Sequence, residues 1–190
     1  MQDNIYAVPE SSLHTESEAP VVQEFYVVSK LKFFLLFFCT MGLYGFYWNY
    51  RSWKQYKIAN NEDMWPVARA IFSIFFTHSL YGIIDMRAVE KDSSYKWSPN
   101  LWATLVVVSI IADNISGRVG GNETLVNSFI FFNLIARGLF MFQAQKAANI
   151  ACGDPEGISN SHFSPLNFLW IFMFPIIFVV AVIAAILFAG

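Results

Sequence analysis

Five long stretches of apolar residues dominate this chain and limit what it can fold into. They cover about residues 31–50, 66–84, 99–113, 124–142 and 166–189. Each approaches the roughly 20 residues that an α-helix needs to cross the hydrocarbon core of a bilayer. Of all residues, 56% are hydrophobic and only 14% are charged, whereas charged residues make up about a quarter of an ordinary soluble domain. The sequence therefore predicts an all-α, polytopic membrane protein with four to five hydrophobic helices.

The first 28 residues have a different composition from the rest. They contain no lysine or arginine, and their acidic residues are Asp3, Glu10, Glu16, Glu18 and Glu24. A segment with this charge and few long apolar stretches does not bury enough surface to fold. We expect residues 1–28 to form a disordered acidic tail, and residues 29–190 to form a single helical membrane domain.

Aromatic and basic residues are concentrated where the first apolar stretch ends. The residues are Tyr47, Trp48, Arg51, Trp53, Lys54 and Lys57. Aromatic rings favour the headgroup layer of a bilayer, and each cation near an anionic surface contributes about 1 kcal/mol. We expect this group to contact anionic lipid headgroups. The alternative interpretation is a binding site for a specific anionic ligand.

A polar stripe is predicted in the second apolar stretch. Arg69, Ser73 and Thr77 follow one another at spacings of four residues, which places them on one helical face, and His78 adjoins them. Three more ionisable residues lie in or at the ends of helical stretches: Asp85, Asp113 and Arg137. Because a lipid-facing charge deep in a bilayer is costly, we expect these residues to face other helices, a water pocket or the interface.

Arg137 allows two interpretations. It lies five residues before the end of the stretch at 124–142, so we expect its guanidinium group to extend to the membrane interface. The alternative is an internal ion pair, in which Arg69 or Arg137 neutralises Asp85 or Asp113. The sequence does not choose among these pairs.

The positions of lysine and arginine bear on orientation, because these residues are enriched in cytoplasmic loops. Five spans with a cytoplasmic N-terminus put six cations inside and four outside. If the first two stretches instead are re-entrant or interfacial hairpins, broken at residues 42–45 and 77–79, the count becomes nine inside and one outside. Both arrangements place the acidic tail in the cytoplasm.

Several motifs together resemble those of a known group of proteins. They are Phe25–Ser29 (FYVVS) followed by a Lys-Phe-rich block, Gly42–Trp48 (GLYGFYW), Tyr50–Trp53 (YRSW), Gln145–Asn149 (QKAAN) and Cys152–Pro155 (CGDP). The chain resembles small inner-membrane proteins of Gram-negative bacteria over nearly its whole length. The resemblance implies a location in the inner membrane, and it carries over no activity.

Three classes of function are compatible with these features. The chain contains no H-E-x-x-H or G-x-S-x-G motif and only two cysteines, Cys39 and Cys152, so we expect no catalytic residues, no metal site and no cofactor. A net charge of −2 argues against nucleic acid as a partner. We expect a non-enzymatic protein that interacts with membrane lipids, a membrane-protein partner or a second copy of itself, in maintenance of the cell envelope. A small oligomeric transporter or channel component is the first alternative, and an intramembrane enzyme is the second.

Overall fold

The structure, a computed structural model, describes residues 23–118 and 121–188. Its helices are α1 (Lys30–Cys39), α2 (Tyr44–Asn60), α3 (Pro66–Ile71), α4 (Ser73–Lys91), α5 (Pro99–Ser116), α6 (Glu123–Ala151), the 3₁₀ turn η1 (Ile158–Asn160) and α7 (Pro165–Phe188). Within these described ranges there is no β-strand. The all-α class is therefore confirmed for this part of the chain.

Three of the helices are long and apolar enough to cross a membrane: α5, α6 and α7. They correspond to the last three apolar stretches of the sequence. A proline is the first residue of α5 and of α7, where its missing N–H costs nothing. Helices α5 and α6 form a hairpin, and the side chain of Asn122 caps α6 by accepting hydrogen bonds from the backbone of Thr124 and Leu125.

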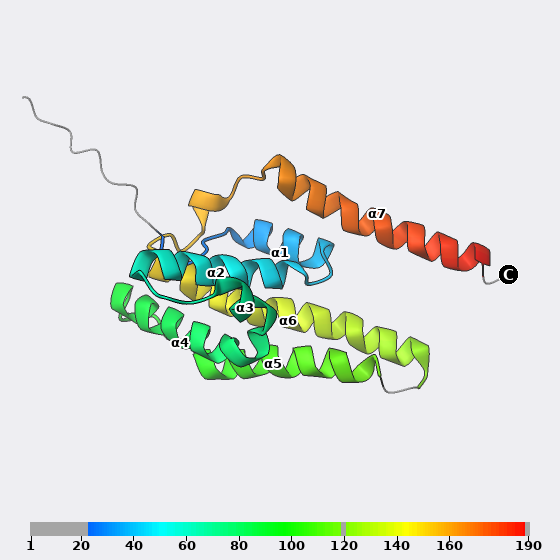
Figure 1. The fold of residues 1–190 in the computed structure, drawn as a ribbon, viewed down its shortest axis with the longest axis horizontal. Helices are drawn as coiled ribbons and strands as arrows, with labels where there is room; N and C mark the ends of the chain where they lie inside the picture. The colour runs from blue at the N-terminus through cyan, green and yellow to red at the C-terminus, as the bar shows by residue number, and fades with distance from the viewer. Residues whose placement is uncertain (1–22, 119–120, 189–190) are drawn as a thin grey trace, which may run out of the picture.

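The first two apolar stretches are not continuous helices. Helix α1 ends at Cys39, and Met41 and Gly42 then adopt positive φ angles of 50° and 85°. Figure 1 shows that α2 runs back in the direction opposite to α1. The second stretch is broken at Phe72, between α3 and α4. The break expected at residues 77–79 is wrong, because these residues lie inside α4.

The chain reaches α1 through an extended segment, Gln23–Ser29, part of which is deeply buried. Phe25, Val27 and Val28 are almost completely inaccessible to solvent. The predicted end of the disordered tail at residue 28 therefore lies too far along the chain. Residues 1–22, the rest of the predicted tail, lie outside the described residues.

Side-chain amides, rather than a second strand, bind the backbone of this segment. The Asn149 side chain accepts a hydrogen bond from the Val28 N–H (3.2 Å) and donates one to the Val28 carbonyl (3.1 Å). Gln145 donates to the carbonyl of Tyr26 (3.0 Å), and Asn160 donates to that of Val27 (2.8 Å). Buried backbone groups need such partners. The segment Phe25–Ser29 and the segment Gln145–Asn149, two of the motifs singled out in the sequence, thus lie in contact.

The loop after α6 completes the enclosure of the extended segment. The Phe25 N–H donates to the Cys152 sulfur at 3.4 Å, and burial raises the pKa of the Cys152 thiol, which keeps it protonated. Gly157 has a φ angle of 66°, and a Cβ atom there would lie 2.4 Å from the carbonyl carbon and oxygen of Val28. Only glycine allows this close approach of loop and segment.

We expect Gly157→Ala to lower the free energy of unfolding by about 2–4 kcal/mol, since the change adds left-handed strain and a steric overlap with Val28. Gly82→Ala is the matched control, because a Cβ at this helical position meets nothing within 4 Å and alanine favours helix by about 1 kcal/mol. Thermal unfolding in detergent, followed by circular dichroism, measures both. Equal stability of the two variants would contradict the described packing of the loop.

Candidate functional site

An internal ion pair joins α5 to α6. Arg137 Nη1 lies 2.6 Å from Asp113 Oδ2, and the two side chains are only 16% and 20% exposed. Asn133 donates to the other carboxylate oxygen (2.5 Å) and to the carbonyl of Ser109 (2.8 Å). The alternative of an internal pair is therefore confirmed, with Arg137 and Asp113 as its members. The Arg137 guanidinium is directed to a carboxylate of the neighbouring helix α5, and α6 continues past residue 142 to Ala151.

A cavity of about 420 Å³ lies beside this ion pair. Its wall includes both helix breaks, with Met41 and Gly42 from the α1–α2 turn and Ile71 and Ser73 from the α3–α4 break. The polar side chains on the wall are Asn49, Ser73, Thr77, Asp113, Asn114 and Arg137, and most of the remainder is apolar. Interrupted helices at membrane depth are tolerated where they line such a cavity.

Gly42 brings the α1–α2 turn against the ion pair. A Cβ at this position would lie 3.1 Å from Arg137 Nη2 and 3.0 Å from Leu134 Cδ1. Since its φ angle is also positive, glycine meets both a conformational and a spatial requirement here. The turn between the two short helices therefore closes one side of the cavity.

The polar groups of the cavity are largely engaged with one another. Thr77 donates to the Ser73 carbonyl (2.7 Å), and Asn49 donates to the Gly45 carbonyl (2.9 Å). The charges of Asp113 and Arg137 cancel, so the cavity has no net charge with which to attract an ion. Among the residues in the described ranges, no three His, Cys, Asp or Glu side chains are grouped as metal ligands are. The arrangement suits helix adhesion and the binding of a small neutral polar molecule.

The predicted polar stripe is divided by the break at Phe72. Ser73 and Thr77 are buried in α4, whereas Arg69 belongs to α3 and lies 4.3 Å from the ring centroid of Trp53. His78 is exposed and forms a hydrogen bond of 3.0 Å with Thr104 of α5. Asp85 is half-buried and forms no ion pair with any residue that the structure describes.

Two of the residues predicted to contact headgroups are instead in the core. Trp48 and Trp53 are fully buried, and the indole of Trp48 donates a hydrogen bond to the side chain of Gln145. Their assignment to the interface is wrong, because the aromatic rings face α6 and α3 rather than the headgroup layer.

The other four residues of that group remain accessible. Tyr47 and Lys54 are exposed, while Arg51 and Lys57 are half-buried. The Lys57 ammonium donates to the Met64 carbonyl at 2.9 Å, and the Arg51 guanidinium lies 5.3 Å from the ring centroid of Tyr26. The structure thus leaves a smaller group of candidates on α2, of which Lys54 is the exposed cation.

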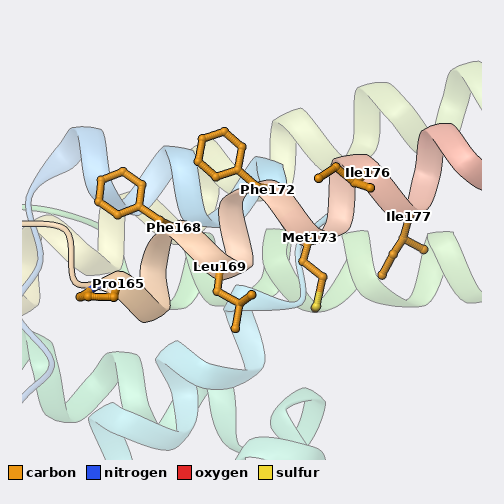
Figure 2. Close-up of a pocket in the computed structure, with 7 residues that line it drawn as sticks. All are labelled: Pro165, Phe168, Leu169, Phe172, Met173, Ile176 and Ile177. Carbon is orange, nitrogen blue, oxygen red and sulfur yellow. The ribbon is translucent and has the colours of Figure 1, made fainter.

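Helix α7 stands apart from the bundle and packs mainly on α1. Figure 2 shows apolar side chains along its surface, from Pro165 to Ile177. They border a shallow groove of about 570 Å³ that is lined by this one helix alone. A second groove, of about 410 Å³, lies between α7 and the α1–α2 hairpin. The first is the apolar surface expected of a helix in lipid.

No role was predicted from the sequence for the amide side chains that form hydrogen bonds at the ion pair and at the extended segment Gln23–Ser29. Asn133 precedes Arg137 by four residues, and Gln145 precedes Asn149 by four. Polar pairs at this spacing share a helical face, so the signal was present within an otherwise apolar helix. Comparison of the chain with protein-family models, curated proteins and solved structures finds no match.

We expect Asp113→Asn or Arg137→Gln alone to lower the free energy of unfolding by about 2–3 kcal/mol. This is below the ~3–5 kcal/mol of a fully buried pair because some water reaches the site. The double variant Asp113→Asn/Arg137→Gln removes both charges, and we expect it to be more stable than either single variant. Thermal unfolding of the four proteins in the same detergent gives the coupling. Additive losses in the double variant would show that the two charges do not interact.

Proposed function

We propose that this chain is a non-enzymatic integral protein of the bacterial inner membrane that binds anionic lipids and membrane-protein partners in maintenance of the cell envelope. The proposal rests on the distribution of charge over the fold. The ion pair of α5 and α6 neutralises the charges of Asp113 and Arg137 inside the bundle. Most of the other cations lie toward one end of the molecule. The exposed ones there can contact headgroups, and they are Lys30, Lys54, Lys91, Lys96 and Lys146.

In the proposed topology, α5, α6 and α7 cross the bilayer, while the hairpins α1–α2 and α3–α4 enter and leave it on one side. The directions of the helices in Figure 1 support this arrangement. The side from which the hairpins enter then contains Lys30, Lys32, Arg51, Lys54, Lys57, Arg87, Lys91, Lys96 and Lys146, and the opposite side contains Arg118. Since lysine and arginine are enriched in cytoplasmic loops, the first side is cytoplasmic.

The loop between α2 and α3 distinguishes this topology from one with five spans. In the variant Glu62→Cys, we expect the new cysteine to be protected from a membrane-impermeant maleimide in intact spheroplasts and labelled in inverted vesicles, because the proposed topology puts this loop on the cytoplasmic side. A cysteine at Arg118→Cys should show the opposite pattern. Both are made in a Cys39→Ser/Cys152→Ser background. Labelling of position 62 in intact spheroplasts would contradict the re-entrant hairpins, because five spans place this loop outside.

The lipid-binding role is tested by removing the accessible cations of α2. We expect the triple variant Arg51→Gln/Lys54→Gln/Lys57→Gln to retain about tenfold less phosphatidylglycerol than the unmodified protein. Each lost contact is worth about 1 kcal/mol, so three of them are enough for an effect of at least this size. The measurement is native mass spectrometry of the full chain in mild detergent during lipid titration, with phosphatidylcholine as the zwitterionic comparison.

The matched control is Lys30→Gln/Lys91→Gln/Lys96→Gln, which removes the same charge from exposed positions on the same side. An equal loss in both triple variants would assign lipid binding to the overall positive charge on the proposed cytoplasmic side rather than to α2. Unchanged retention of phosphatidylglycerol in the α2 variant would overturn the role of α2.

A further inference from the structure

The groove between α7 and the α1–α2 hairpin is lined by apolar and polar residues together. Its lining includes the apolar residues Leu36, Leu43 and Phe174 and the polar residues Tyr47 and Asn167. The remaining lining residues are Thr40, Tyr44, Leu166 and Trp170. A volume of about 410 Å³ is within the range of small-molecule sites. This mixed lining therefore fits an elongated amphiphile that has an apolar part and a polar group.

Hydrogen-bond donors converge beside the groove. Tyr44, Tyr47 and Arg51 lie at spacings of three and four residues, so they share one face of α2. Tyr26 joins them from the extended segment: its ring centroid is 5.7 Å from that of Tyr47 and 5.3 Å from the Arg51 guanidinium. This cluster of three phenols and one guanidinium, here called the donor cluster, adjoins the groove that Tyr44 and Tyr47 line.

The donor cluster contains no acceptor other than its own phenol oxygens, and two of its buried groups have no hydrogen-bond partner within the described part of the chain. Tyr44 is only 5% exposed, and its hydroxyl has no hydrogen-bond partner there. The Nε of Arg51 is also buried without a partner, and no described carboxylate forms an ion pair with this guanidinium. Leaving such a buried donor unsatisfied costs about 1–3 kcal/mol. An anionic oxygen supplied by a ligand would remove this cost.

We propose that this groove is a specific site for one anionic phospholipid, with its phosphate at the donor cluster and one acyl chain between α7 and the α1–α2 hairpin. Guanidinium and phenol groups both donate to phosphate oxygens, and the single charge of Arg51 matches that of a phosphodiester. The chain of the lipid covers apolar surface on α1, α2 and α7 together, which explains how α7 is held beside the hairpin. The inference rests on the proposed function, since it assigns a site and a stoichiometry to the lipid binding.

Native mass spectrometry of delipidated full-length protein tests the site. During titration with phosphatidylglycerol we expect one lipid to bind more tightly than the rest. Arg51→Gln should weaken this first binding step about tenfold, as expected for loss of a charge-assisted contact. Tyr44→Phe, which keeps the ring and removes the hydroxyl, should weaken it several-fold. Lys96→Gln removes one charge from an exposed position outside both α2 and the groove. As the charge control, it should leave the first step within twofold.

The acyl-chain part of the site is tested by filling the groove. Leu43 lines it and is 49% exposed, whereas Leu139 on α6 has the same 49% exposure and does not line it. We expect Leu43→Trp to weaken the first binding step about tenfold and Leu139→Trp to leave it unchanged. Free glycerol phosphate, which has the phosphate without the chains, should not compete at lipid concentrations. Thermal unfolding in detergent confirms that each variant is folded.

The outcomes separate this proposal from the general one. If Leu43→Trp and Tyr44→Phe bind the first lipid as the unmodified protein does, the specific site is overturned, even where the α2 triple variant still loses phosphatidylglycerol. Competition by glycerol phosphate would overturn the acyl-chain groove. If no lipid is retained more tightly than the others, both the stoichiometry and the site are overturned.

Discussion

The position of the first helices depends on hydrogen bonds between two amide side chains of α6 and the backbone of the extended segment. An amide carries both a donor and an acceptor, so Asn149 satisfies the N–H and the carbonyl of Val28 as a neighbouring strand would. Gln145 donates to Asn149 and to Tyr26 and accepts from Trp48. These contacts join the extended segment, α2 and α6 at one place. Because the segment leads directly into α1, its position determines where the first hairpin begins.

The two helix breaks follow from a second constraint, the need to satisfy backbone groups away from water. Both breaks lie against the cavity at the α5–α6 ion pair rather than against open lipid. At the first break the positive φ angles of Met41 and Gly42 reverse the chain within a few residues. The Thr40 hydroxyl accepts the Tyr44 N–H (2.9 Å) and donates to the Leu36 carbonyl (2.7 Å), so it serves the groups that the turn leaves without helical partners.

The parts of the fold that were predictable from the sequence are those controlled by local chemistry. Length and apolarity identified α5, α6 and α7, and proline as the first residue marked where α5 and α7 begin. A break near Gly42 belonged to the alternative with re-entrant or interfacial hairpins, and glycine permits the left-handed turn found there. The break at Phe72 has no glycine or proline beside it, so composition gave no signal for its place.

The rest of the site depends on contacts between distant residues. Tryptophan is a residue type typical of the membrane interface, so the sequence placed Trp48 there. Its hydrogen-bond partner, Gln145, is 97 residues away along the chain, and this contact was not predictable from the local sequence. The sequence offered four candidates for an ion pair, but only the packing of α5 against α6 determines that Asp113 pairs with Arg137. Likewise, the sequence grouped Arg51 with Trp48 and Trp53, whereas packing buries the two indoles and leaves Arg51 half-buried beside Tyr26. In each case the sequence identified the residue, but it did not show which helix packs against that residue.

The two polar regions of the bundle differ in the balance of donors and acceptors. At the ion pair, one guanidinium faces one carboxylate, and the nearby amide and hydroxyl groups bind backbone carbonyls. The two charges there neutralise each other, and their main effect is to join α5 to α6. The hydroxyls of Ser109 and Tyr81 in the same region have no hydrogen-bond partner among the described residues. At the donor cluster, the guanidinium of Arg51 and the phenol of Tyr44 meet no described acceptor. A fold that satisfies its other deeply placed charges internally is expected to do the same here, so the excess of donors implies an acceptor from outside the chain. In a protein with helices able to cross a membrane, the acceptor present at high concentration at that depth is the phosphate of a lipid.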